Sequence, residues 1–312
     1  MAQADSGAPA GALAQLSAGL ADAVERAGAA VVRVEARRGH GATGIVWSRE
    51  GQIVAADHTI EREDDITVGF ADGRTLAAKL VARDPGTDLA LLTVETADQA
   101  GEHAYTPLAR ASDADVRIGH LVLALGRPGA DVMASLGIVS AVGGPWRTGR
   151  GGRIERYVRT DATLYTGFSG GPLVDAAGRL VAINSWTLSQ GAGFAIPVGT
   201  VERVVQALTT GGVKRPYLGV GAQAVALPGG VKAQVGGQET GLILLTVEPN
   251  GPGAKSGLLI GDVLVAFNGQ ALRSTEDLLA QLQAAGAGQA ATAKLVRGGE
   301  LRDLPVTVGE RA

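Results

Sequence analysis

Residues 167–174 read Gly-Phe-Ser-Gly-Gly-Pro-Leu-Val, and this stretch decides the fold. Glycines on both sides of Ser169 allow backbone conformations that a β-carbon would forbid. In such a turn the N–H groups of Gly167 and Ser169 can point at one spot beside the Ser169 hydroxyl, as a developing oxyanion requires. A plain glycine turn leading into a strand is the alternative, and the pattern alone does not decide between the two.

The order of the histidines narrows the choice of fold. The same residues fit the G-x-S-x-G elbow of α/β-hydrolases, in which the histidine follows the serine. Here all four histidines precede Ser169; they are His40, His58, His103 and His120. The subtilisin order needs an aspartate ahead of the histidine, and Asp57 is badly placed to orient its neighbour. The order that remains is His, Asp, Ser, as in chymotrypsin-type enzymes.

Composition excludes several classes of function. The length of 312 residues favours two domains over one. A net charge of −3 without a Lys/Arg cluster argues against a nucleic-acid partner. The chain has no cysteine, so disulfides and thiol chemistry are excluded. The scattered histidines lack metal-binding spacing, and neither a metal nor another cofactor is expected.

The first 28 residues are predicted to form an N-terminal helical segment. Apolar residues recur at helical spacing between Leu13 and Val24, which predicts a helix from about Pro9 to Arg26 that packs on the protein body. An oligomer contact is the alternative role. We see neither a signal peptide nor a run long enough to span a membrane, so the chain reads as cytoplasmic.

From residue 29 the apolar residues recur with a period of two, and short strands with frequent turn signals are predicted. These strands cover residues 31–36, 41–47, 52–56, 66–70, 75–81, 89–94, 121–125, 133–141, 156–160, 171–174 and 180–184. Such a series is typical of a mainly β protein and provides enough strands for two small barrels.

Three motifs follow one another along these strands. Residues 54–58 read Val-Ala-Ala-Asp-His, residues 84–92 read Asp-Pro-Gly-Thr-Asp-Leu-Ala-Leu-Leu, and residues 161–174 contain the serine stretch. Residues 193–197, Gly-Phe-Ala-Ile-Pro, close the domain. In order, spacing and flanks this region resembles the protease domain of HtrA/Deg-type serine proteases. The resemblance implies a chymotrypsin-like double β-barrel over residues 29–208.

The resemblance implies a catalytic triad of His58, Asp88 and Ser169, with an oxyanion hole at Gly167 and Ser169. The chemistry of the three side chains fits these roles. A serine hydroxyl is a poor nucleophile until a base takes its proton, and a histidine can accept and return a proton near neutral pH. Asp88 would hold the imidazole tautomer and stabilise the imidazolium. The alternatives are a strand-end histidine and a turn aspartate like Asp84.

Two positions depart from the family pattern without removing a reacting atom. Phe168 replaces a small polar residue before the nucleophile, and we expect its side chain to pack beneath the turn. Ala56-Asp57 stands where the family often has a different polar pair. By resemblance, the primary pocket has walls from residues 162–166 and 183–186. The second segment is free of acidic residues, which predicts an apolar side chain of small or medium size before the scissile bond.

The C-terminal third carries a second resemblance. Residues 254–258 read Ala-Lys-Ser-Gly-Leu, and residues 261–269 read Gly-Asp-Val-Leu-Val-Ala-Phe-Asn-Gly. Both runs resemble a PDZ domain of the bacterial type, a small α+β fold. We predict a linker over residues 209–216 and the PDZ domain over residues 217–310.

The PDZ resemblance implies a peptide-binding segment. Its residues would be Tyr217, Leu218, Gly219 and Val220. Their backbone N–H groups would receive a peptide carboxylate, and the bound peptide would add as a strand. An edge strand in a spacer domain is the alternative.

Together the motifs predict a serine endopeptidase of unfolded or flexible polypeptides, with a PDZ domain that binds peptide C-termini. A catalytically weak, chaperone-like adaptor is the alternative. The family is usually extracytoplasmic and is often trimeric through N-terminal aromatic residues. The first aromatic residue here is Trp47, so a homo-oligomer stays an open expectation. Residues 143–153 are rich in glycine and arginine, which predicts a mobile and positively charged loop, with a plain solvated surface loop as the alternative. By resemblance, this loop senses the PDZ domain or its ligand through Arg147, Arg150 or Arg153.

Overall fold

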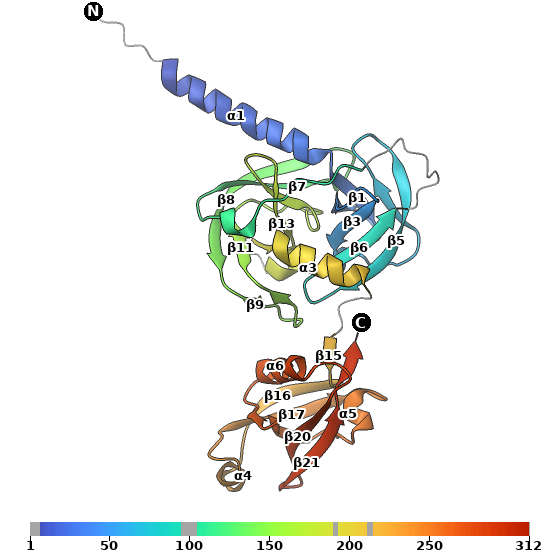
Figure 1. Ribbon diagram of the computed structural model, residues 1–312, viewed down its shortest axis with the longest axis vertical. Coiled ribbons are helices and arrows are strands. Elements are labelled where there is room, and N and C mark those ends of the chain that lie inside the picture. The colour runs from blue at the N-terminus through green and yellow to red at the C-terminus, as the bar shows by residue number, and fades with distance from the viewer. Residues whose placement is uncertain (1–6, 95–104, 190–192, 211–214, 312) are drawn as a thin grey trace, which may run out of the picture. The chain divides into compact units, whose positions relative to one another are not determined.

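The computed structural model describes residues 7–94, 105–189, 193–210 and 215–311. The chain divides into two units, Met1–Val213 and Lys214–Ala312, and each is described by itself (Figure 1). The division falls inside the stretch that the sequence predicts as a linker.

The first barrel closes from six antiparallel strands in the order β1-β2-β3-β6-β5-β4. Its strands are β1 (Val31–Glu35), β2 (Ala42–Val46), β3 (Gln52–Ala56), β4 (Ile66–Gly69), β5 (Thr75–Asp84) and β6 (Leu89–Val94). Valine, isoleucine and leucine fill its interior, and these residues suit a pleated, half-buried surface. The 3₁₀ turn η1 (Asp57–Thr59) follows β3 directly.

The second barrel closes in the order β11-β14-β13-β12-β7-β8. Its strands are β7 (Leu121–Gly126), β8 (Met133–Gly143), β11 (Tyr157–Thr160), β12 (Pro172–Asp175), β13 (Leu180–Asn184) and β14 (Phe194–Pro197). The two closed barrels confirm the predicted double-barrel fold. Two short helices accompany this barrel, η2 (Asp113–Asp115) and α2 (Trp186–Ser189).

The segment over residues 143–153 is more ordered than the sequence predicts. Strands β9 (Trp146–Arg147) and β10 (Arg153–Ile154) pair into a hairpin, and Thr148 at its turn is buried. The Trp146 ring stacks on Phe194 with centroids 5.1 Å apart. This packing gives the hairpin a fixed place that a mobile loop would lack.

Two long helices belong to the first unit. Helix α3 (Val198–Thr209) buries Val201, Val204, Val205 and Leu208 against the barrels, and each such side chain stabilises the fold by about 1.5–3 kcal/mol. Helix α1 (Gly7–Gly28) packs only through its second half, where Ala23 and Ala27 are buried.

The prediction that α1 packs on the protein body is wrong for the first half of the helix. Leu13 and Leu16 are 68% and 46% exposed, and Figure 1 shows the helix extending away from the barrels. Among the described residues, helices that combine the length and apolarity of a membrane span are absent.

The second unit is a small α+β fold, as predicted. Its main sheet has the order β16-β17-β18-β20-β21, with β19 added on β18, and β15 pairs with β22. The strands are β15 (Arg215–Tyr217), β16 (Val220–Ala226), β17 (Thr240–Val247), β18 (Val263–Phe267), β19 (Gln270–Ala271), β20 (Ala290–Arg297), β21 (Glu300–Thr307) and β22 (Gly309–Arg311). The helices are α4 (Gly229–Gln234), α5 (Pro252–Lys255) and α6 (Thr275–Ala285). Ser274 begins α6 with a capping box, in which Asp277 closes the reciprocal bond.

Candidate active site

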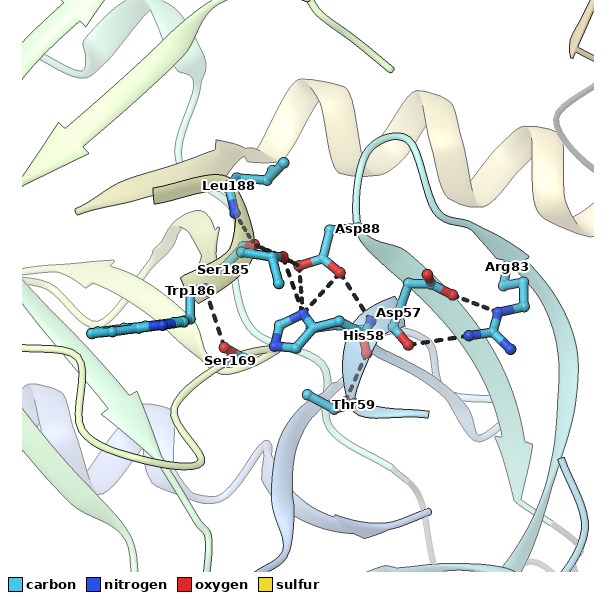
Figure 2. A network of polar contacts seen from close by, with 11 residues as sticks. Asp57, His58, Thr59, Arg83, Asp88, Ser169, Ser185, Trp186 and Leu188 are labelled. Carbon is cyan, nitrogen blue, oxygen red and sulfur yellow. Dashed lines mark hydrogen bonds and ion pairs between the residues drawn. The ribbon is translucent and has the colours of Figure 1, made fainter. Parts of the chain in front are cut away.

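His58 and Asp88 meet because β3 and β6 are antiparallel neighbours. Ala56, the last residue of β3, pairs with Leu89, the first residue of β6. His58 follows β3 in the turn η1, and Asp88 directly precedes β6. Asp88 has a φ of 59°, in the left-handed region that aspartate tolerates better than most residues. Figure 2 shows its carboxylate facing the His58 ring.

The Asp88 carboxylate is buried and fully engaged. Its Oδ2 accepts a hydrogen bond from His58 Nδ1 at 2.8 Å, and its Oδ1 accepts one from the His58 backbone N–H at 3.0 Å. The hydroxyls of Ser185 and Thr187 donate to Oδ2 at 2.5 and 2.8 Å. These four donors hold both the carboxylate and the histidine ring in place.

Burial by itself would raise the pKa of the Asp88 carboxyl. The hydrogen bond and charge of His58, helped by the Ser185 hydroxyl, outweigh burial and lower that pKa below its ordinary value. The carboxylate is therefore ionised at neutral pH and can only accept hydrogen bonds. Nδ1 of His58 then carries the proton in this contact, and Nε2 is left to accept one.

The neighbouring carboxylate of Asp57 serves a different partner. Its Oδ1 lies 2.5 Å from Nε of Arg83, and Arg83 Nη2 also donates to the backbone carbonyls of Asp57 and Ile60. Asp57 thus anchors the turn that carries His58 and does not orient the ring, in agreement with the sequence argument (Figure 2).

The turn before β12 requires its glycines. Gly167 and Gly170 have φ values of 87° and 85°, and a β-carbon on Gly170 would lie 2.1 Å from the carbonyl oxygen of Thr43. The Phe168 side chain is fully buried and meets the Tyr165 ring edge-on at 5.3 Å. This confirms that Phe168 packs beneath the turn.

The N–H groups of the turn divide into two sets. Those of Phe168, Gly170 and Gly171 donate to backbone carbonyls at 2.9–3.0 Å. Those of Gly167 and Ser169 donate to no group within the described ranges. The turn therefore leaves unpaired the two donors that the sequence predicts as an oxyanion hole.

Thr43 fixes the adjacent peptide unit. Its hydroxyl donates to the Gly167 carbonyl at 2.6 Å and accepts the Arg127 N–H at 2.8 Å. Because the Gly167 carbonyl is held in this bond, the turn keeps its conformation without help from the two unpaired N–H groups.

Ser169 completes the site from the second barrel. Its hydroxyl oxygen accepts a hydrogen bond from the Trp186 N–H at 3.2 Å. In the described part of the chain no hydrogen bond joins this hydroxyl to the His58 ring, although Figure 2 shows the two side by side. Such bonds are often long before substrate binds and tighten in the complex.

A cavity of about 280 Å³ contains both Ser169 and His58. Its apolar wall comes from Leu164, Tyr165 and Trp186, within the two segments predicted to form the primary pocket. Acidic side chains are absent from its lining. Arg37 also lines it, from the turn between β1 and β2.

Sequence reasoning missed the roles of four side chains of this site, namely Arg37, Thr43, Ser185 and Thr187. Arg37 and Thr43 lie far from every motif in the sequence. Thr187 lies in the short helix α2 that follows β13. The only feature of the sequence that could have indicated its role is the group of polar residues after this buried strand.

The second unit has a groove of about 620 Å³ lined by all four residues of the predicted peptide-binding segment. Helix α6 borders it with Leu278, Leu279 and Leu282. Among the strands that the structure describes, β16 lies at the edge of the main sheet and pairs only with β17. Within the described residues, the backbone N–H groups of Leu218 and Gly219 make no hydrogen bond. An open strand edge with two unpaired donors can receive an extended peptide and its carboxylate.

Comparison with known proteins agrees with both units. Residues 42–183 match the family model of a trypsin-like peptidase domain, and residues 216–308 match that of a PDZ domain. The solved structure of the HtrA-type protease AlgW with a decapeptide superimposes with a TM-score of 0.67 at 30% identity. The match covers 94% of this chain and 99% of AlgW. The chain belongs to the HtrA family of serine proteases.

Other HtrA relatives support the assignment. The serine endoprotease of Yersinia pestis superimposes with a TM-score of 0.68 at 29% identity, over 94% of this chain and 98% of the other. A probable periplasmic serine endoprotease of the DegP-like type from Pseudomonas fluorescens is 35% identical over 86% of this chain and 56% of its own length. The chloroplastic Protease Do-like 1 of Arabidopsis thaliana is 32% identical over 88% and 64%. The chain thus spans little more than half the length of the curated relatives.

Proposed function

We propose that the chain is a serine endopeptidase that cleaves unfolded or flexible polypeptides through an acyl-enzyme. The observation that carries the proposal is the buried Asp88–His58 pair beside Ser169, together with two unpaired N–H donors in the serine turn. The family membership supports the same reaction.

In this proposal His58 Nε2 takes the proton of the Ser169 hydroxyl as its oxygen attacks the peptide carbonyl carbon. The N–H groups of Gly167 and Ser169 stabilise the oxyanion. The protonated ring then passes its proton to the leaving amine, and water, activated by the same nitrogen, hydrolyses the ester. Asp88 keeps the ring in one tautomer and stabilises its positive charge.

One observation favours a second candidate, the catalytically weak, chaperone-like adaptor. Ser169 accepts a hydrogen bond from the Trp186 N–H and donates none to the His58 ring in the described residues, so its hydroxyl is not yet paired with the base. A chain that stays in this arrangement would bind polypeptides and cleave them slowly.

Labelling with an organofluorophosphonate separates the two candidates, because only an activated serine reacts. Wild type should be labelled at Ser169 and should cleave casein, and Ser169→Ala should do neither. An unlabelled wild type that still prevents aggregation of an unfolded protein would establish the adaptor.

We also infer that the second unit binds peptide C-termini in the groove beside Tyr217–Val220. The AlgW structures include complexes with a decapeptide and a tripeptide, which supports a peptide as the ligand. A fluorescent peptide with an apolar C-terminal residue should bind, and its C-terminal amide should bind at least about tenfold more weakly, since it lacks the carboxylate.

We infer that the β9–β10 hairpin transmits the effect of peptide binding to the serine turn through Arg147, Arg150 or Arg153. Replacing the arginine that carries the signal with Ala should abolish activation by the peptide, and a chain truncated after residue 212 should show no such activation.

The name of the Pseudomonas relative supports an extracytoplasmic setting. Particle mass in solution tests for a homo-oligomer.

A further inference from the structure

Arg37 is a basic side chain at the edge of the cavity that holds Ser169 and His58. It lies between β1 and β2, and its Nε donates to the His40 carbonyl at 2.9 Å. Within the described residues, Nη1 and Nη2 of Arg37 make no hydrogen bond, and no carboxylate lies at ion-pair distance from them. The nearby Glu35 is already paired with Arg33 at 2.9 Å. The guanidinium therefore has donors available to a bound molecule.

The two walls of the cavity come from different barrels. Residues 164–167 and Trp186 belong to the second barrel, whereas Arg37, His58 and Thr59 belong to the first. In the proposed reaction His58 delivers a proton to the leaving amine, so the chain beyond the scissile bond leaves along the first-barrel wall.

The turn that carries Arg37 also approaches the oxyanion turn. A β-carbon on Gly167 would lie 3.0 Å from the carbonyl oxygen of Gly41, which ends this turn. The side chain of Arg37 is thus within reach of the first residues after the scissile bond, since an extended chain advances only about 3.3 Å per residue.

We propose that Arg37 selects an acidic side chain at the second position after the scissile bond. A guanidinium presents a planar fork that matches a carboxylate in two parallel hydrogen bonds. Because Arg37 is partly exposed, we expect the preference to be about fivefold for glutamate over glutamine and to weaken at high salt. This inference rests on the proposed endopeptidase function and names a specificity residue for it.

Arg38 offers a matched control. It is the next residue in the same turn and is exposed, but it does not line the cavity. A charge reversal there changes the overall field of the turn in the same way, without changing the cavity wall.

The test uses internally quenched peptides that share one cleavage site, mapped by mass spectrometry, and differ only at the second residue after it. Wild type should cleave the glutamate, glutamine and lysine peptides with kcat/KM falling in that order. The glutamate-to-lysine ratio should fall close to one in Arg37→Ala and Arg37→Gln, and invert in Arg37→Glu. Arg38→Glu should keep the wild-type order. Ratios within one variant are independent of how much of it is folded.

The two proposals fail in different ways. Equal rates for the three peptides in wild type, or a wild-type order in Arg37→Glu, would overturn the role of Arg37 while leaving the protease intact. The same preference for an acid placed two residues before the scissile bond would overturn its placement on the leaving side. No cleavage by wild type above Ser169→Ala would overturn the endopeptidase itself, and this inference with it.

Discussion

The hydroxyl of Thr148 donates a 2.6 Å hydrogen bond to the backbone carbonyl of Gly86, 62 positions away in the sequence. Thr148 is buried at the turn of the β9–β10 hairpin, and Gly86 lies in the short turn that ends at Asp88. Gly152 completes the contact, because a β-carbon there would lie 2.1 Å from the Gly86 oxygen. The hairpin therefore braces the turn that carries Asp88.

Thr148→Val should lower kcat by roughly threefold to tenfold with little change in KM. The substitution keeps the shape but leaves the Gly86 carbonyl without a partner, which costs about 1–3 kcal/mol. Thr148→Ser retains the hydroxyl and is the matched control. Steady-state kinetics on a casein-derived peptide would decide the matter, and equal rates for both variants would show that the contact has no influence on Asp88.

The contrast between Asp88 and Thr148 shows which residues of the site can be predicted from the sequence and which cannot. Asp88 could be predicted because it lies in a short local motif, residues 84–92, that resembles the corresponding motif of the family. Thr148 acts through a contact between segments that are distant in the chain, and nothing in a glycine-rich stretch indicates which hydroxyl will be buried. The same holds for Arg37, whose proposed role depends on the cavity that the two barrels form between them.

For the N-terminal helix, the sequence predicts the element but not its packing partner. Its apolar spacing predicts the helix correctly but does not say what the apolar face contacts. Leu13 and Leu16 remain exposed, because only the last turns of α1 reach the barrel. Periodicity therefore predicts an element, while its partner depends on the length of helix that the fold can cover.

Ser169→Ala, His58→Ala and Asp88→Asn should each remove most hydrolysis while leaving the fold intact. In the proposed reaction the three side chains act on one proton transfer, so a double variant should be little worse than a single one. Rates for the three single and three double variants, with melting curves as a check on folding, provide the measurement. Losses that multiply from single to double variants would contradict the triad.

Gly170→Ala should reduce labelling of Ser169 by an organofluorophosphonate more than tenfold. The left-handed backbone costs alanine about 1–2 kcal/mol, and the new β-carbon would meet the Thr43 carbonyl at 2.1 Å. Gly129→Ala is the control, because a β-carbon there has open space around it. Similar labelling of the two variants would mean that the turn adapts to a side chain.

Asp262 and Arg297 should make the stability of the second unit depend on pH. Asp262 is buried, and both its oxygens lie 2.7 Å from nitrogens of Arg297. Burial alone would raise the pKa of the Asp262 carboxyl, but the hydrogen bonds of Arg297, together with the Leu259 N–H, lower it below its ordinary value.

Since the folded-state pKa of Asp262 lies below the unfolded value of about 3.9, the pair stabilises the fold fully above that pH. The contribution is lost as the pH falls through the lower, folded-state pKa. Arg297→Leu should destabilise the unit by about 2–4 kcal/mol at pH 7, because a buried carboxylate loses its partner, and by much less at pH 2. Urea unfolding of the full chain at both pH values, followed by a probe in the second unit, measures this difference. Lys294→Leu is a suitable control, because that lysine pairs with the exposed Asp303 and does not contribute to the lowered pKa of Asp262. A loss for Arg297→Leu that is the same at pH 7 and pH 2 would mean that the arginine stabilises the unit through packing and not through the Asp262 charge.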